Sequence, residues 1–411
     1  MEVQVFELAY ALDTLYLLVM GAFVMWMAAG FSMLEAGLVR SKSTVQILTK
    51  NVALYSIASI MYMIVGYNLM YSTGGDGIIP DINYFLGSSD NSAADYVAGD
   101  TYYSRFSDFF FQVVFVVTAM SIVSGAVAER MKLSSFLLFC VVMTGLIYPI
   151  QGYWKWGGGF LEDVGFYDFA GSGVVHLCGG AAALAGVILL GSRKGKYVNG
   201  KINAIPGANM PLATLGTFIL WLGWFGFNGG RELIVSNVVD ANAVALVFVN
   251  TNAAAAGGVI AALLFSRILF GKYDLSMSLN GAIGGLVSIT AEPLAPTPEL
   301  ASVIGAIGGI LVVISIIVLD KSRIDDPVGS ISAHGTCGIW GLIAVPLSNT
   351  GVSLGTQLYG AATIFAWTFS MALIFWGLLK VVIGIRVSKE AEEIGVDVSE
   401  CGMEAYPEFK K

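Results

Sequence analysis

The sequence predicts an all-α polytopic membrane protein with eleven transmembrane helices, arranged as two inverted-topology halves of five helices plus one final helix. Three observations predict this fold: long apolar runs, a low content of charged residues, and a histidine motif that occurs twice. Of the 411 residues, 56% are hydrophobic and only 12% are charged, and a soluble chain of this length needs far more charge on its surface. Apolar runs of about 18 or more residues are typical of transmembrane helices. Helices also satisfy their own backbone polar groups inside lipid.

The apolar runs define the predicted domain organisation. The eleven predicted spans cover residues 10–38, 45–72, 106–128, 133–152, 169–191, 209–229, 241–270, 277–292, 300–320, 327–348 and 356–385. The inverted halves are expected at about 8–192 and 205–348, followed by the final helix at 356–385. Residues 1–385 therefore form one transmembrane domain, and the polar residues 386–411 form a short tail.

The basic residues predict the orientation of the chain. When alternate loops are grouped, all but three of the 21 Lys and Arg residues fall on one side, and only Arg105, Lys155 and Arg231 fall on the other. Positively charged loops mark the cytoplasmic side. The N-terminus is therefore expected outside and the C-terminal tail in the cytoplasm. The net charge of −8 gives no indication of nucleic-acid binding.

The only two histidines lie in two copies of one motif, Asp-x-x-Gly-Ser-x-x-x-His. The first copy runs from Asp168 to His176 at the start of the fifth span, and the second from Asp326 to His334 at the start of the tenth. Five spans carry the chain from one histidine to the other, so the motifs run through the membrane in opposite directions, as in inverted-repeat transporters. At 1.5 Å per residue, each histidine is expected about 12 Å into a ~30 Å core.

The histidine pair has three interpretations. A single membrane histidine is often a structural hydrogen bond between helices, but two in matched motifs at matched depth favour a function. A metal site is the third interpretation, because Cys178 and Cys337 follow the histidines closely. Zinc requires three or four protein ligands, and the neighbouring spans supply no further cluster of Cys, His or carboxylates. We therefore expect no metal and no cofactor.

Several segments together carry a resemblance to a known family. They are Gly37-Leu-Val-Arg-Ser-Lys42, Phe111-Gln-Val-Val-Phe115, Ser124-Gly-Ala-Val-Ala-Glu-Arg130, Trp156-Gly-Gly-Gly159, Asp168-Phe-Ala-Gly171 with His176, Gly223-Trp-Phe-Gly-Phe-Asn228, Asn250-Thr-Asn252 and His334-Gly-Thr-Cys-Gly338. Over nearly its whole length the chain resembles an ammonium transporter of the Amt/Mep/Rh superfamily, of the prokaryotic Amt type. The resemblance implies a homotrimer in a prokaryotic plasma membrane. Each subunit has its own pore, and the protein is not an enzyme.

The resemblance also implies roles for individual residues, by position. It places Phe115 and Trp156 in an outer ammonium-binding vestibule, Phe115 and Phe227 in a stacked gate, His176 and His334 in the narrow pore with Trp224 in its wall, and Asp168, Asp326, Gln112 and Thr290 in supporting positions. Aromatic faces attract ammonium by about 0.5–2 kcal/mol each. The alternative for the same aromatic residues is packing or an interfacial belt.

Magnitudes favour the passage of ammonia rather than of the ion. An unpaired ion in a dry pore costs tens of kcal/mol. Removing the proton from ammonium at neutral pH costs roughly 1–5 kcal/mol, at 1.36 kcal/mol per pKa unit. Neutral imidazoles each offer one donor and one acceptor. We therefore expect the two histidine rings to share a hydrogen bond.

Arg231 departs from the family pattern, which usually has a serine at this position. A fixed charge in the vestibule would repel ammonium by ~1 kcal/mol in water at 4 Å and by about 4 kcal/mol at an effective dielectric of 20. Two interpretations remain: Arg231 turns away and pairs with Glu232, Asp163 or Asp240, or it faces the vestibule and changes how ammonium binds.

Two further expectations concern partners and rival functions. Glu393-Ile-Gly-Val-Asp397 and Gly402-Met-Glu-Ala-Tyr406 resemble a tail gated by a cytoplasmic PII signalling protein, and an ordinary solvated tail is the alternative. The expected substrates are ammonium or ammonia, with methylammonium as a further one.

The main rival function is an ammonium sensor of the same fold that binds without conducting. An intramembrane enzyme is a distant third interpretation, because no nucleophile motif or membrane carboxylate pair is found.

Overall fold

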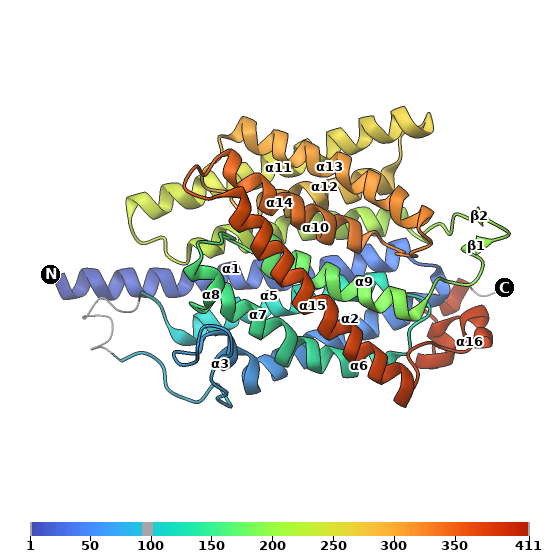
Figure 1. Cartoon of the computed structure of the whole chain (residues 1–411), viewed down its shortest axis with the longest axis horizontal. Helices are drawn as coiled ribbons and strands as arrows, with labels where there is room; N and C mark the ends of the chain where they lie inside the picture. The colour runs from blue at the N-terminus through green and yellow to red at the C-terminus, as the bar shows by residue number, and fades with distance from the viewer. Residues whose placement is uncertain (1, 93–101, 410–411) are drawn as a thin grey trace.

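The computed structural model describes residues 2–92 and 102–409, and almost all regular structure in these ranges is helical (Figure 1). The long helices are α1 Glu2–Leu38, α2 Thr44–Met61, α5 Arg105–Ala126, α6 Leu133–Val142, α9 Cys178–Leu190, α10 Met210–Gly229, α11 Val238–Phe270, α12 Leu275–Ile289, α13 Pro298–Lys321 and α15 Leu354–Val382. The shorter helices are α3 Tyr67–Met70, α7 Tyr148–Trp156, α8 Phe160–Asp163, α14 Cys337–Ala344 and α16 Lys389–Ile394. Strands β1 Tyr197–Val198 and β2 Lys201–Ile202 form an antiparallel hairpin, with Tyr197 opposite Ile202. The predicted all-α class is confirmed.

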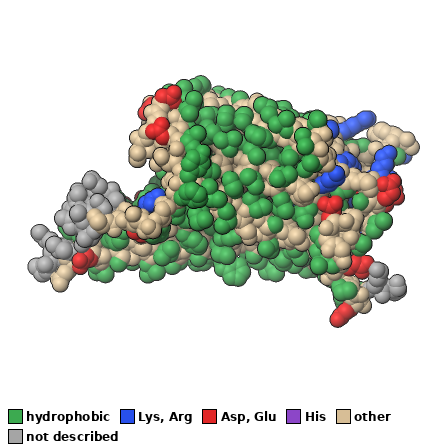
Figure 2. All heavy atoms as spheres, turned by 90° about the horizontal axis from the view of Figure 1, so that it is seen from below, with side chains coloured by type: hydrophobic (Ala, Val, Ile, Leu, Met, Phe, Trp, Pro, Cys, Tyr) green, Lys and Arg blue, Asp and Glu red, His purple; other side chains and the backbone are tan. Residues whose placement is uncertain are grey.

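The predicted spans coincide with helical segments along the described chain. Nine of these segments are long and apolar enough to cross a membrane. The eighth and tenth predicted spans correspond to the shorter apolar segments Leu275–Ile289 and Ile331–Leu347. Figure 2 shows a broad hydrophobic belt between two ends at which the charged side chains gather. The chain is a polytopic membrane protein, and the number of eleven spans and their orientation stay predictions.

The long axis of the molecule separates two ends (Figure 1). The N-side carries the N-terminus, the loop after α3 and helix α8. The C-side carries the C-terminus, the β1–β2 hairpin and α16. These two names are used below for the ends of the molecule.

Close helix packing depends on small residues. A Cβ at Gly37 of α1 would lie 2.4 Å from the Ala213 nitrogen of α10, and a Cβ at Gly216 of α10 would lie 2.2 Å from the Leu34 nitrogen of α1. Small residues at helix crossings allow backbones in a membrane to approach each other. The high glycine content of the sequence therefore produces tight pairing between a helix of the first predicted half and a helix of the second.

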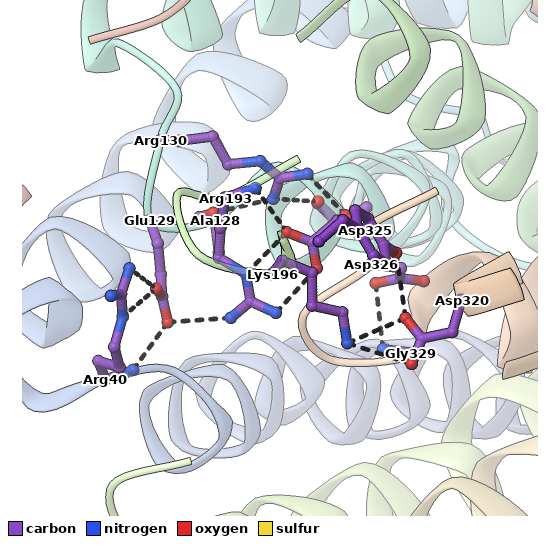
Figure 3. A network of polar contacts seen from close by, with 12 residues as sticks. Arg40, Ala128, Glu129, Arg130, Arg193, Lys196, Asp320, Asp325, Asp326 and Gly329 are labelled. Atoms are coloured by element: carbon purple, nitrogen blue, oxygen red, sulfur yellow. Dashed lines mark hydrogen bonds and ion pairs between the residues drawn. The ribbon is translucent and has the colours of Figure 1, made fainter. Parts of the chain in front are cut away.

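A buried network of charges joins the two predicted halves at the C-side (Figure 3). Arg193 bridges two carboxylates, with Nη1 3.3 Å from Glu129 Oε1 and Nη2 2.9 Å from Asp325 Oδ1. Arg40 contacts the same Glu129 at 2.5 Å, and Arg130 Nη2 donates to the Asp325 carbonyl at 2.6 Å. Loss of one partner from a buried ion pair costs about 3–5 kcal/mol. We therefore expect this network to fix the loops of the two halves against each other.

The tail after α15 is docked on the C-side. The Asp397 carboxylate accepts a hydrogen bond of 2.8 Å from the Gln46 backbone nitrogen in the first turn of α2. Lys42 Nζ donates to the carbonyls of Glu392 and Glu393 at 2.9 and 2.5 Å. The tail is therefore tied to the loop between α1 and α2 rather than solvated along its whole length. Residues 410 and 411 of the predicted tail lie outside the described residues.

Candidate functional site

The two motif copies begin with the same backbone turn. Asp168 Oδ1 accepts from the Gly171 nitrogen at 3.1 Å, and Asp326 Oδ1 accepts from the Gly329 nitrogen at 3.1 Å. Both glycines have left-handed backbones, with φ of 111° and 84°, which a residue with a Cβ rarely adopts. The motif therefore uses its Asp to satisfy backbone N–H groups and its Gly to turn the chain into a helix.

Only part of each segment from Asp to His is helical. The helical turns that carry the histidines are π-helical and span Ser172–Leu177 and Ile331–Thr336. The residues from Asp168 to Gly171 form the capped turn and not the helix, so the rise of 1.5 Å per residue does not apply to them. The depth of about 12 Å therefore stays a prediction.

The two histidines meet in the interior although they come from opposite ends. Asp168 lies beside Trp156 near the N-side, whereas Asp326 follows Asp325 of the C-side network. His176 Nδ1 and His334 Nδ1 are 3.2 Å apart, and both side chains are buried. One ring donates and the other accepts, so the expected hydrogen bond is present. His176 Nε2 has no protein partner among the described residues.

Aromatic rings surround the histidine pair. Trp224 lies 5.0 Å from His176 and 6.4 Å from His334 between ring centroids, and is nearly parallel to the second ring at 6°. Trp224 Nε1 donates to Thr290 Oγ1 at 2.9 Å. Phe31 lies 5.9 Å from His334 between ring centroids. Thr290 therefore fixes the orientation of Trp224. Sequence reasoning missed Phe31, because no motif distinguishes it from the other phenylalanines of the chain.

Two stacked phenylalanines cover the histidine pair toward the N-side. The Phe115 and Phe227 rings are 4.0 Å apart at 25°, and Phe227 lies 5.3 Å from His176. Gln112, one turn before Phe115, donates to Asp108 Oδ1 at 3.0 Å. Sequence reasoning missed Asp108. The available signal was a carboxylate in the first turn of a largely apolar helix.

A cavity of about 370 Å³ opens at the N-side of these rings. It is lined by Lys155, Trp156, Gly158, Glu162, Tyr167, Asp168, Phe169 and Arg231. The Trp156 ring meets Phe115 edge to face at 6.1 Å, and Trp156 Nε1 donates to the Asp168 carbonyl at 2.9 Å. Burial raises the pKa of Asp168 to about 6, against the hydrogen bonds from Val174, Gly173 and Gly171 that favour the carboxylate. The Asp168 carboxylate thus faces the helix start, and its backbone carbonyl holds Trp156.

Arg231 turns into this cavity. Its Cζ lies 4.3 Å from the centroid of the Trp156 ring, and its Nε donates to the Phe169 carbonyl at 3.1 Å. The interpretation that Arg231 pairs with Glu232, Asp163 or Asp240 is wrong, because none of these described carboxylates forms an ion pair with it. The guanidinium instead covers the aromatic face to which the resemblance assigns ammonium.

The cysteines near the histidines make other contacts. Cys178 Sγ accepts from Thr368 Oγ1 at 3.5 Å, and Cys337 Sγ donates to the Gly308 carbonyl at 3.4 Å. Within residues 2–92 and 102–409, no group of three or more His, Cys, Asp or Glu side chains is placed to hold a metal ion. The observed arrangement at the centre is therefore an imidazole pair flanked by aromatic rings.

Comparisons with known proteins place the chain in a family. The model of the Ammonium Transporter Family matches residues 15–406. The chain is 41% identical to ammonium transporter Amt2 of Archaeoglobus fulgidus, over 97% of this chain and 88% of that protein. Among solved structures, a "Sensor Amt Protein" has a TM-score of 0.88 and 35% identity, covering 96% of this chain and 99% of that one. Mep2 of Candida albicans has a TM-score of 0.84 and 25% identity, covering 97% and 92%. The chain therefore belongs to the ammonium transporter family.

Proposed function

We propose that the chain takes up ammonium at the N-side cavity, removes its proton there, and passes ammonia through the pore of His176 and His334. The observation that carries this proposal is that the cavity, the phenylalanine stack and the histidine pair follow one another through contacts between their side chains. Trp156 of the cavity meets Phe115 of the stack at 6.1 Å, Phe227 lies 5.3 Å from His176, and His176 contacts His334 at 3.2 Å. The order along this line is a cation-attracting aromatic cavity, an apolar gate and a neutral polar pair.

Physical chemistry assigns a task to each part. The cavity is lined by aromatic and polar side chains, so it can hold an ion. The enclosed centre offers no charged group, and an unpaired ion there would cost tens of kcal/mol. His176 Nε2 is buried and lacks a protein partner among the described residues, so it can exchange a hydrogen bond with a passing ammonia. The proton is either left at the cavity or relayed separately through the imidazole pair.

Several further assignments belong to the same proposal. Phe115 and Trp156 form the vestibule, Phe115 and Phe227 the gate, and Trp224 the pore wall. The N-side faces outward, so the docked tail lies in the cytoplasm, where a PII signalling protein binds it. The protein works as a homotrimer in the plasma membrane of a prokaryote and also accepts methylammonium. The charge distribution of the loops and the family membership support these assignments.

A second candidate function is ammonium sensing without conduction. Two observations favour it: the guanidinium of Arg231 covers the Trp156 face, and a similar solved protein bears the name "Sensor Amt Protein". A sensor would bind ammonium in the cavity and keep the phenylalanine gate closed.

Current from liposomes on a supported membrane after an ammonium pulse separates the two functions. A current that decays faster as more protein is packed into each liposome indicates charge-moving transport. A decay rate independent of the protein-to-lipid ratio indicates binding only and favours the sensor. A pH change inside the liposomes without a current indicates passage of ammonia alone. We expect His176→Ala to reduce the transport signal at least about tenfold, since it removes half of the polar pair.

A further inference from the structure

The N-side cavity already contains a cation from the chain itself. Two basic side chains line it, Lys155 and Arg231. Lys155 forms an ion pair with Glu162, whereas Arg231 forms no ion pair with any described carboxylate. Arg231 instead has its Cζ 4.3 Å from the Trp156 centroid and donates from Nε to the Phe169 carbonyl at 3.1 Å. An aromatic face and a carbonyl oxygen are also the two partners that a small cation without a counter-ion would use.

The backbone that carries Arg231 is held in place. Arg231 lies in the short 3-10 turn Gly230–Glu232, and a Cβ at Gly230 would come within 2.4 Å of the Phe111 ring. The turn is followed by Leu233, with φ of 68°, and by Val235, whose nitrogen donates to Asp13 at 2.7 Å. Because the backbone is fixed on both sides of the turn, the guanidinium can move only by rotation about the side-chain bonds of Arg231.

In its observed position the guanidinium also interacts with groups beyond Trp156 and Phe169. Arg231 interacts electrostatically with Asp108, whose carboxylate accepts from the Tyr67 hydroxyl at 2.7 Å and from Gln112 Nε2 at 3.0 Å. Tyr71 also lies within electrostatic range of the guanidinium. A guanidinium that leaves Trp156 therefore has negative charge and a phenol nearby.

We propose that Arg231 is a tethered competitor of the transported cation. Its guanidinium occupies the cation position over Trp156, so ammonium binds there only when it displaces Arg231 toward Asp108. A tethered group acts at a high effective concentration, so the cavity rejects dilute ammonium and responds only at higher concentrations. This inference rests on the proposed function in one respect, namely that ammonium binds over Trp156. Arg231 is thereby a specificity-determining residue that sets the working concentration range.

The main test compares half-saturating ammonium concentrations in the liposome assay. We expect Arg231→Ser to lower the half-saturating concentration by about tenfold, which corresponds to about 1.4 kcal/mol. Arg231→Lys keeps the charge but not the planar group, and we expect a smaller decrease of about threefold. Arg105→Gln is the matched control: Arg105 is another N-side cation, but it bonds to the Ser89 carbonyl at 3.2 Å and is not among the residues that line the cavity. Arg105→Gln should change the half-saturating ammonium concentration by less than about twofold.

Guanidinium chloride at low millimolar concentration provides the second arm. In Arg231→Ser the free guanidinium ion should fill the vacated position and inhibit ammonium competitively, and calorimetry should detect its binding. The wild-type protein should show neither effect, because its own guanidinium already occupies the position. Thermal unfolding of each variant confirms that it is folded, and Arg231→Gln replaces the serine variant if that variant is not.

The outcomes of the two arms are distinguishable. Equal half-saturation in wild type and Arg231→Ser, or equal guanidinium sensitivity in both, would overturn the inference and leave the proposed function intact. If no variant conducts, the transport proposal fails, and calorimetry then decides the inference alone. Guanidinium binding to Arg231→Ser only would support it, and binding to neither protein would overturn it.

Discussion

The two copies of the histidine motif share a backbone arrangement but have different surroundings. In both, the Asp carboxylate bonds to the nitrogen of the glycine three residues later and of the residue five positions later. The first copy opens beside aromatic Trp156, whereas the second follows Asp325, which belongs to the C-side charge network. The two copies therefore share the Asp-capped turn that precedes each histidine. They differ in the side chains that surround this turn.

The largest expected effect comes from removing the capping carboxylates. Asp168 accepts three backbone hydrogen bonds, at 2.8–3.1 Å, and Asp326 accepts two. Each unsatisfied buried N–H costs about 1–3 kcal/mol. We expect Asp168→Ala to destabilise by about 3–5 kcal/mol and Asp326→Ala by about 2–3 kcal/mol, measured by thermal unfolding in detergent.

Asparagine variants are the controls for this comparison. Asp168→Asn and Asp326→Asn each keep one acceptor oxygen and should retain part of the stability. If Asp326→Ala proved as destabilising as Asp168→Ala, the number of backbone hydrogen bonds that each carboxylate accepts would not determine the loss of stability. The neighbouring charge network would then have to contribute.

The crossing of the two motif helices gives the next prediction. Gly180 and Gly338 each lie four residues after a histidine. A Cβ at Gly180 would be 2.5 Å from the Gly335 Cα, and a Cβ at Gly338 would be 2.5 Å from the Ser172 carbonyl oxygen. We expect Gly180→Ala and Gly338→Ala to cost about 1–3 kcal/mol each, because overpacking separates the helices.

Gly377 in α15 offers a matched control, since a Cβ there would meet no atom within 4 Å. Gly377→Ala should be neutral or stabilise by about 0.5–1 kcal/mol. Unfolding in detergent measures stability, and the transport signal should fall with the first two variants only. A destabilising Gly377→Ala would mean that α15 packs against something beyond this single chain.

The sequence predicted the features that depend on local pattern. Apolar runs of membrane length identified the helices, and the repeated Asp-x-x-Gly-Ser-x-x-x-His pattern predicted that His176 and His334 meet. The sequence pattern did not show how long the turn is that Asp168 and Asp326 cap before each helix begins. A capping Asp and an Asp inside a first helical turn have the same spacing.

Contacts between distant residues were beyond sequence reasoning. Arg231 had nearby carboxylates in the sequence, yet the fold places it against Trp156 and the Phe169 carbonyl, which come from other segments. The bridge from Arg193 to Glu129 and Asp325 likewise joins three loops that are far apart in the chain. Such partners are selected by the packing of whole helices, which no local pattern encodes.

The last prediction concerns acid and Asp325, which directly precedes the second motif copy. Burial alone would raise the pKa of Asp325, but hydrogen bonds from Arg193 and the charges of Arg193 and Arg130 hold it down at about 2. The unfolded pKa is about 3.9, so the carboxylate contributes about 2.6 kcal/mol at neutral pH, and this contribution is lost as the pH falls from about 5 to about 1.

Thermal unfolding of wild type and Asp325→Asn between pH 7 and pH 2.5 tests this. The variant should be less stable at pH 7, since the Arg193 charge loses a buried partner. The two curves should converge as the pH falls, because protonation then removes the same charge from the wild type. Parallel curves over the whole range would show that the charge of Asp325 does not account for the acid dependence of stability. Convergence would show that the Asp325 carboxylate stabilises the C-side network through its charge, next to the second copy of the motif.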